Sequence, residues 1–295
     1  VKFEKKDTPQ KVNIKLFRQG PKDIRLNDTK ISQKELIGTL NTVIFCPEDL
    51  QLIKGTPSGR RRFLDMEISQ TSATYYHQLM QYNRLLQQRN AILKEYRGKQ
   101  NIPLEEWDLQ LADMASFIVK KRLESLKKIN LLIDLMNRKL TGGLENLTIG
   151  YEQPYMDNGS LEFTKEGFYE RIKAALPQDR HRMTTSVGPH RDDLRFFSDA
   201  MDLKKFGSQG QQRTAVLSLK LSELEFIKSE VGEYPVLLLD DVLSELDESR
   251  RANLLQFIHK RIQTFITTTD IHDFKDLKSV QFISCEGGKV QYGQP

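Results

Sequence analysis

The most regular hydrophobic pattern in the chain lies between Ser58 and Gly143. Apolar residues recur there every three or four positions, the spacing of one face of an α-helix. The pattern stops at Arg97-Gly98 and resumes after Pro103, so it predicts two long helices joined by a short loop. Each helix is expected to have about 35 residues and to reach about 50 Å. The apolar positions are Tyr75, Leu79, Tyr82, Leu86 and Leu93, then Trp107, Leu111, Met114, Ile118, Leu123, Leu126, Ile133, Met136 and Leu140.

The segments on either side of this hairpin show strand patterns. Residues 43–46 are an apolar run stopped by Pro47, and residues 161–163 predict another short strand. Near the C-terminal end, a helix that opens at Ser208 is followed by a strand at 236–239, a helix at 248–260 and a strand at Thr264–Thr267. This alternation of strand and helix predicts a parallel sheet. We expect three regions, 1–58, 59–142 and 143–295.

The composition restricts the class of protein. Hydrophobic residues make up 38% and charged residues 29% of the 295 residues, which excludes a disordered chain and is typical of a globular protein. The longest apolar run, residues 236–239, is far shorter than the roughly 20 residues that a membrane span needs. Cys46 and Cys285 are the only cysteines, so neither a disulfide framework nor a zinc site is indicated. We expect a cytoplasmic protein without a membrane partner.

Two acidic residues follow the apolar strand at 236–239. Asp240 and Asp241 are expected at the carboxyl edge of a parallel sheet, where open α/β folds bind their ligands. One carboxylate there can hold Mg²⁺ beside a nucleotide, and a second can orient an attacking water. The alternative is that both acids cap the turn that follows the strand.

The start of the preceding helix is a candidate phosphate site. Ser208 is a good N-cap, and Gly207 and Gly210 allow the backbone to approach a ligand closely. Free N–H groups and the helix dipole favour an anion at such a position. The alternative is an ordinary capped helix start.

The order and spacing of the motifs along the chain indicate a protein family. The helix start is followed after about 30 residues by the acids, then by Ser244-Glu245-Leu246-Asp247, and then by a strand that leads to Thr269. This series resembles the ABC-type ATPases of the SMC/Rad50 group. The resemblance implies an α/β, ABC-type ATPase head with an inserted αα-hairpin: a remnant of the first lobe at 1–58, the hairpin at 59–142 and the head at 143–295.

The resemblance also implies a role for each motif. Thr269 stands where many of these enzymes have the switch histidine, and its hydroxyl can donate one hydrogen bond there. The remaining roles are the ABC signature for Ser208, Gln209, Gly210 and Gln211, the catalytic Walker B pair for Asp240 and Asp241 with Asp240 as the Mg²⁺ ligand, and the D-loop for Ser244 and Asp247.

Two further stretches resemble one family within this group, the RecF family of DNA repair and replication proteins. These are Gly-Pro-His-Arg-Asp-Asp at 188–193 and the block at 45–65, so the resemblance spans nearly the whole chain. His190 and Arg191 are candidate phosphate contacts; an internally paired Arg191 and a structural His190 are the alternatives. Glu48 lies near the position of the Q-loop glutamine.

The phosphate-binding P-loop motif, Gly-x-x-x-x-Gly-Lys-Ser/Thr, does not occur in the sequence. Gly-Lys is found only at 98–99 and 288–289, and neither pair is followed by Ser or Thr. In the family this loop lies in the first strand–helix unit. We therefore expect a P-loop-bearing part upstream of Val1, and we expect these 295 residues by themselves to be inactive as an ATPase.

The resemblance implies cofactors and partners for the full-length protein. ATP and Mg²⁺ would bind between the P-loop of one copy and the signature of another, so ATP would drive formation of a homodimer and be hydrolysed slowly. The protein would bind DNA at single-strand/double-strand junctions. Together with RecO and RecR it would help to load RecA recombinase in homologous recombination and the SOS response.

The distribution of charge is compatible with DNA binding. The net charge is only +5, but residues 60–139 contain 15 Lys and Arg against 9 Asp and Glu. Long cations of this kind contact phosphates without reading the base sequence. The alternative is a solvated helix face with pairs such as Glu124 and Lys128. The candidate DNA contacts are Arg60, Arg61, Arg62, Lys120, Lys121 and Arg122.

Three other functions each require a feature of their own. An SMC-like DNA clamp or tether without significant turnover needs helices several times longer than these. A nuclease of the overcoming-lysogenization type needs a second acidic cluster on another α/β unit. A Ser/His/Asp hydrolase needs a Gly-x-Ser-x-Gly turn, which the sequence lacks.

Overall fold

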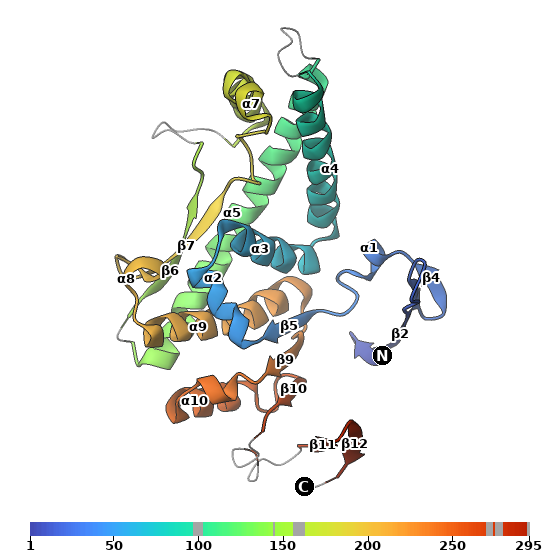
Figure 1. Ribbon diagram of the computed structural model, residues 1–295. Coiled ribbons are helices and arrows are strands. Elements are labelled where there is room, and N and C mark those ends of the chain that lie inside the picture. Colours follow the sequence, from blue (N-terminus) through green and yellow to red (C-terminus); the bar gives the residue numbers. More distant parts are fainter. Residues whose placement is uncertain (97–102, 144, 156–162, 270–273, 275–279, 294–295) are drawn as a thin grey trace.

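Long helices and small sheets alternate along the chain, and strands far apart in the sequence meet in the same sheet (Figure 1). The computed structural model describes residues 1–96, 103–143, 145–155, 163–269, 274 and 280–293. In this part of the chain no helix is long and apolar enough to cross a membrane. The predicted helix end at Arg97-Gly98 and almost all of the predicted strand at 161–163 lie outside the described residues.

The N-terminal residues form an antiparallel meander with the strand order β1-β2-β3-β4. Asn27 and Asp28, which connect β3 to β4, both have positive φ angles (48° and 66°), as a tight two-residue hairpin turn requires. A short helix, α1, follows the sheet. The bounds of these elements are β1 (Lys2–Lys5), β2 (Thr8–Lys15), β3 (Asp23–Leu26), β4 (Thr29–Ile31) and α1 (Gln33–Leu36).

The hairpin exists, but its first arm differs from the prediction. The expected single helix is divided into α3 and α4 at Ser72, whose backbone is extended (φ −140°, ψ 100°). The Ser72 side chain accepts a hydrogen bond from the Tyr75 N–H at 3.2 Å and so caps a new helix that points in another direction (Figure 1). The helices are α2 (Gln51–Lys54), α3 (Pro57–Thr71), α4 (Ala73–Glu95) and α5 (Glu105–Thr141).

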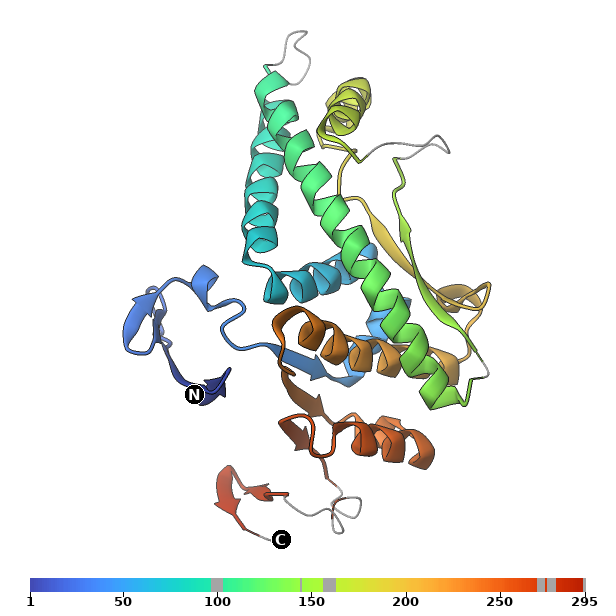
Figure 2. The same cartoon turned by 180° about the vertical axis from the view of Figure 1, so that it is seen from behind.

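The second arm agrees with the prediction. Helix α5 has 37 residues and is therefore about 55 Å long. It ends at Gly142, which takes the left-handed conformation (φ 69°) that a glycine adopts most easily. Figure 2 shows α4 and α5 side by side, with α5 continuing past α4 toward the rest of the protein.

A second antiparallel sheet lies beside α5. Its strands pair in the order β6-β7-β8, and residues 188–193, the Gly-Pro-His-Arg-Asp-Asp stretch, lead into β7. The elements of this region are β6 (Leu147–Glu152), α6 (Lys165–Ala174), α7 (Leu176–Arg182), β7 (Asp193–Ser198), β8 (Met201–Asp202) and α8 (Leu203–Phe206).

The predicted parallel sheet is confirmed. Strand β9 lies between β10 and β5, and both neighbours run parallel to it. Phe45, Leu239 and Ile266 are in register across the three strands, so their carboxyl ends form one edge. The elements are β5 (Thr42–Phe45), α9 (Gln209–Val231), β9 (Val236–Asp240), α10 (Glu248–Ile258) and β10 (Thr264–Thr267), followed by the hairpin β11 (Ile283–Glu286) and β12 (Lys289–Tyr292). Short 3-10 turns occur at Pro47–Leu50 and Leu243–Glu245.

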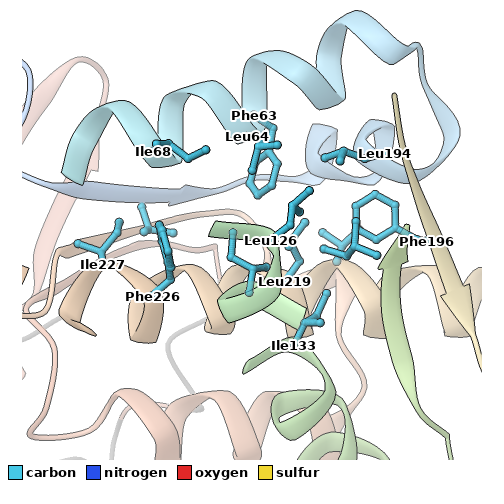
Figure 3. Close-up of a cluster of buried hydrophobic side chains, with 14 of the residues drawn as sticks. Phe63, Leu64, Ile68, Leu126, Ile133, Leu194, Phe196, Leu219, Phe226 and Ile227 are labelled. Atoms are coloured by element: carbon cyan, nitrogen blue, oxygen red, sulfur yellow. The ribbon is translucent and has the colours of Figure 1, made fainter. Parts of the chain in front are cut away.

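The hydrophobic core is centred on α9, which lies between α5 and the parallel sheet (Figure 1). Leu219 and Phe226 of α9 meet Leu126 of α5 and Phe63 of α3 in one cluster (Figure 3). Leu194 and Phe196 of β7 belong to the same cluster. One close-packed core thus joins α5, the antiparallel sheet and the parallel sheet. These three parts therefore hold fixed positions relative to one another.

One face of the parallel sheet is largely uncovered by the residues that the structure describes. Ile44, Leu238 and Phe265 are in register on this face, and Ile44 and Phe265 are 51% and 55% exposed. Parallel sheets are normally covered on both faces. The opposite face carries Val43, Phe45, Leu237 and Leu239, all of which are buried in the core.

Candidate functional site

The two acids at the end of β9 lie at the carboxyl edge of the parallel sheet, as predicted, and both are exposed. The hydroxyl of Thr267 on β10 donates a 2.6 Å hydrogen bond to Oδ1 of Asp240 and accepts one from the Asp241 N–H at 3.1 Å. The other carboxylate oxygen of Asp240 has no hydrogen bond to any residue that the structure describes. Asp240 therefore presents one fixed and one open oxygen to solvent.

Asp241 has a different local role. Its φ of 53° is in the left-handed region, where the chain turns away from the sheet. The Ser244 hydroxyl donates to the Asp241 carbonyl at 2.8 Å and lies 3.3 Å from its Oδ1. Asp241 thus stabilises this turn, which was the alternative reading of the acids, while its carboxylate stays exposed at the sheet edge.

The residues expected in the D-loop follow directly. Asp247 is the N-cap of α10: its side chain accepts from the Arg250 N–H at 2.9 Å and forms an ion pair with the Arg250 guanidinium. The hydrogen bond from the backbone lowers the pKa of the Asp247 carboxyl. Thr269, at the expected switch position, is exposed just beyond β10.

The start of α9 is a capping box. Ser208 Oγ accepts from the Gln211 N–H at 3.2 Å, and Gln211 Oε1 accepts from the Ser208 N–H at 3.0 Å. The Gln211 amide also donates to Glu145 at 3.0 Å. Ser208 and Gln209 are exposed, and Gly210 has open space where a Cβ would be, apart from Ser208 Oγ at 3.9 Å. The ordinary capped helix start is therefore present, and its outer surface is accessible.

The start of α9 and the end of β9 contact different residues. The α9 start bonds to Glu145, whereas the β9 end bonds to Thr267. Glu48 lies in the 3-10 turn after β5, at the same edge of the parallel sheet as the two acids. Thr267 is not part of any motif that the sequence shows. Aligning the two parallel strands would have found it, since Thr267 is in register with Asp240.

Two of the predicted DNA contacts are wrong, because the structure buries their charges. Arg60 is 3% exposed and forms a two-bond pair with Asp193, with distances of 2.7 and 2.8 Å. Arg122 is 2% exposed and its guanidinium pairs with both oxygens of Asp65 at 3.0 Å. Neither guanidinium can reach a phosphate at the surface in this fold.

Loop 188–193 holds its own charged residues internally. His190 Nε2 lies 3.0 Å from the Thr185 carbonyl, which can only accept, so Nδ1 accepts from the Tyr82 hydroxyl at 2.6 Å. Burial lowers the pKa of His190 to about 4, and the ring is neutral at pH 7. Arg191 donates to the Thr185 carbonyl at 2.6 and 3.0 Å. Arg191 also donates to the Thr184 hydroxyl at 3.2 Å, so it is held internally by these two threonines rather than by the neighbouring aspartates.

The remaining cations are closer to solvent. Arg62 and Lys120 are exposed, Arg61 is half-buried, and Lys121 lies 3.5 Å from Glu124. The expected pair between Glu124 and Lys128 is replaced by an ion pair between Lys128 and Glu230 of α9. These four cations stay candidates for contact with DNA.

A buried charged cluster was not predicted. Lys220 of α9 lies 3.3 Å from Glu223 and 3.4 Å from Asp49, and Glu67 of α3 belongs to the same cluster. Burial raises the pKa of Glu67 to about 7 and that of Glu223 well above its usual value. In the sequence, Lys220 and Glu223 interrupt the apolar residues of α9 at positions that face the core, and this pattern could have predicted a buried ion pair.

Known proteins resemble the chain over most of its length, although no family model matches it. A "DNA replication and repair protein RecF" from Alkaliphilus oremlandii is 47% identical over 281 residues, which are 94% of this chain and 76% of that protein. A solved structure of the recombination mediator protein RecF with ATP, in the RecFOR pathway, has a TM-score of 0.87 at 35% identity and covers 97% of this chain and 77% of that one.

An Smc head bound to the winged-helix domain of ScpA shares the fold at 13% identity, with a TM-score of 0.54 and coverage of 98% of this chain and 68% of that one. The fold is therefore that of the ABC-type ATPase heads, and the chain belongs to the RecF family of DNA replication and repair proteins.

Proposed function

We propose that the full-length protein is an ATP-dependent DNA-binding protein of recombinational repair that binds ATP between two copies of itself and hydrolyses it slowly. The observation that carries this proposal is the open, exposed Asp240 oxygen at the carboxyl edge of a parallel sheet, in a chain whose relative was solved with ATP. ATP bound to the dimer and not to the monomer would act as a dimerising ligand.

The residues at the sheet edge suit Mg²⁺. No three His, Cys, Asp or Glu residues gather into a metal cluster within the described ranges, so a site there has one or two carboxylates. Mg²⁺ commonly binds proteins in this way and completes its shell with water and phosphate oxygens, where it neutralises charge. The open oxygen of Asp240 would hold the ion, Thr267 would keep the Asp240 carboxylate in its orientation, and Asp241 would orient the attacking water.

The start of α9 would act on the nucleotide of the partner copy. Ser208, Gln209, Gly210 and Gln211 present an accessible helix N-terminus, which favours a phosphate. Ser244 and Asp247 would form the D-loop between the two nucleotides, and the Thr269 hydroxyl would donate a hydrogen bond to the γ-phosphate. A Ser208→Arg substitution should prevent the ATP-dependent dimer, because the longer side chain fills the phosphate position.

The 295 residues are expected neither to hydrolyse ATP nor to dimerise with it by themselves, because their sequence contains no P-loop motif. Isothermal titration of this chain with Mg-ATP is the test. Tight binding together with measurable turnover would overturn the expectation.

DNA junctions and partner proteins complete the proposal. The relative solved with ATP is described as part of the RecFOR pathway, which supports cooperation with RecO and RecR. We propose that the protein binds DNA at single-strand gaps and junctions and, through these partners, assists RecA loading. An SMC-like tether is disfavoured, because α4 has only 23 residues and is about 35 Å long.

The ATPase assignment is tested by Asp240→Asn in the full-length protein. We expect ATP hydrolysis to fall by at least about a hundredfold, since the open carboxylate oxygen is lost, while the protein remains folded. The matched control is Asp113→Asn, which changes an exposed acid on α5. Normal turnover in the Asp240 variant would refute the role of Asp240.

A further inference from the structure

A cleft outside the proposed nucleotide site opens between α3, α4 and the loop at 188–191. Its volume is about 490 Å³, within the range of small-ligand sites. It is lined by residues of both helices and of the loop, including Arg61, Arg62, Met66, Tyr76, Leu79 and His190.

The back wall of this cleft is fixed. The Arg122 guanidinium donates hydrogen bonds to Asp65 and, at 2.7 Å, to the Pro189 carbonyl. At Gly188 (φ 132°) an added Cβ would lie 2.3 Å from the Tyr82 hydroxyl, so only glycine allows the loop to pack this closely against α4. The wall is therefore a preorganised surface.

The mouth of the cleft carries unneutralised positive charge. Arg62 is exposed and has no hydrogen bond or ion pair with any described residue. Arg61 uses one nitrogen to donate to the Asp192 carbonyl at 2.7 Å. Arg122 is paired with Asp65 in the back wall, so Arg61 and Arg62 carry the positive charge of the mouth, and His190 adds none because it is neutral. An anionic ligand is favoured at this position.

The side walls suit a flat, aromatic group. Tyr76 is half-buried, and its hydroxyl has no hydrogen bond to a described residue, so its ring is what the cleft offers. Leu79 and the 51% exposed Met66 add apolar surface next to it. Nucleobases stack on such aromatic side chains in single-strand binding proteins, whatever the base.

The positive surface continues outside the cleft. Lys204 of α8 donates to the Gly55 carbonyl at 2.7 Å, and the same carbonyl accepts from Arg60, so α8 lies against the start of α3. Lys54 and Lys205 are exposed beside this contact. Exposed lysines beside the start of α3, together with Arg61 and Arg62 in its second turn, suit an extended polyanion better than a compact ligand.

We propose that this cleft holds one unpaired nucleotide of a DNA strand, with its phosphate at Arg61 and Arg62 and its base against the Tyr76 ring. A base within a continuous duplex has both faces stacked on its neighbours and cannot lie against the Tyr76 ring, so the site distinguishes a single-stranded end or gap from continuous duplex. The inference rests on the proposed DNA-binding function and names the element that would recognise the junction.

The first test compares two DNA ligands by fluorescence anisotropy, using the full-length protein with Mg-ATP. One is a blunt duplex, and the other is the same duplex with a short oligothymidine overhang. Tyr76→Leu should weaken binding of the overhang DNA about tenfold and leave the blunt duplex unchanged, since base stacking is lost. Tyr76→Phe keeps the ring and should bind like the wild type.

The charge of the cleft mouth is tested in the same assay. Arg62→Gln should weaken binding of the overhang DNA about fivefold more than that of the blunt duplex. The matched control is Arg84→Gln, because Arg84 is exposed on α4 beside the cleft but does not line it. If the Tyr76 and Arg62 variants weaken both DNAs equally, or neither, the inference is wrong while the proposed DNA binding stands.

Crosslinking of the wild-type protein removes any dependence on folding of the variants. An overhang that contains 5-iodouracil is irradiated, and the crosslinked peptide is identified by mass spectrometry. A crosslink at Tyr76 supports the inference, and crosslinks only elsewhere overturn it, leaving an acidic peptide as the occupant that the cleft chemistry suits next. If the wild-type protein binds neither DNA, the proposed function fails as well.

Discussion

Helix α3 contributes to two buried clusters of charge that are built in opposite ways. In the first, Arg122 is paired with Asp65 and lies 3.5 Å from Asp192, which also accepts hydrogen bonds from Tyr151 and Tyr155. In the second, Lys220 faces Asp49, Glu67 and Glu223, so three acids share one cation.

The difference decides how each cluster responds to pH. Burial raises the pKa of Asp192 only to about 6, because Arg122 and the tyrosines stabilise its charge, so it is ionised at neutral pH. Glu67 has no hydrogen-bond partner for Oε2 among the described residues, and burial raises its pKa to about 7. The first cluster is a fixed ionic connection between α3, α5 and the loop before β7. The second cluster retains a proton in the folded state.

Breaking the first cluster should have the largest effect on stability. Arg122→Met removes the cation that neutralises Asp65 and Asp192 and leaves Asp192 fully buried and Asp65 partly buried, so we expect the free energy of unfolding to fall by about 3–5 kcal/mol. Chemical denaturation measures it. The control is Arg84→Met at an exposed position of α4, which should cost less than about 0.5 kcal/mol. Equal effects at the two positions would contradict the role assigned to the cluster.

Glu67→Gln tests how the second cluster makes the free energy of unfolding depend on pH. The raised pKa means that the folded state binds a proton that the unfolded state has released, so this group lowers stability as pH rises from about 4.5 to 7. Replacing it with a neutral amide should raise the free energy of unfolding by about 1–3 kcal/mol at pH 8 and change it little at pH 4.5.

Urea unfolding at both pH values measures this difference, with the exposed Glu95→Gln as control. The groups that face Glu67 are Lys220, Glu223 and Asp49. A Glu67→Gln effect that is the same at pH 4.5 and pH 8 would show that folding does not raise the pKa of Glu67.

Exposed cations near the first cluster should matter least for stability. Replacing Lys120 and Lys121 with Gln should change the free energy of unfolding by less than about 0.5 kcal/mol. If both lysines contact phosphates, the slope of log affinity for duplex DNA against log salt should become shallower by about 2. An unchanged slope would assign this part of α5 to packing or to a protein partner. Arg122 is left intact in this variant, because it is buried.

Much of the site was predictable, because its signals are local. Ser208 caps α9 through residues within one helical turn, and Asp240 follows an apolar strand of four residues. The break at Ser72 was not predicted, because the helical spacing of apolar residues continues through it. Only the structure shows that α4 turns away from α3 and that the two helices pack on different partners.

The sequence by itself determined the order of the motifs, the parallel sheet with acids at its edge, and the absence of a P-loop motif from these residues. The tertiary structure alone decided which charges are available to a ligand. Arg60 and Asp193 are 133 residues apart, and Arg122 and Asp65 are 57 apart, so nothing in the local pattern distinguishes these arginines from Arg62. The reason is physical: helix and strand signals come from neighbouring residues, whereas burial and ion pairing depend on segments that meet only when the chain has folded.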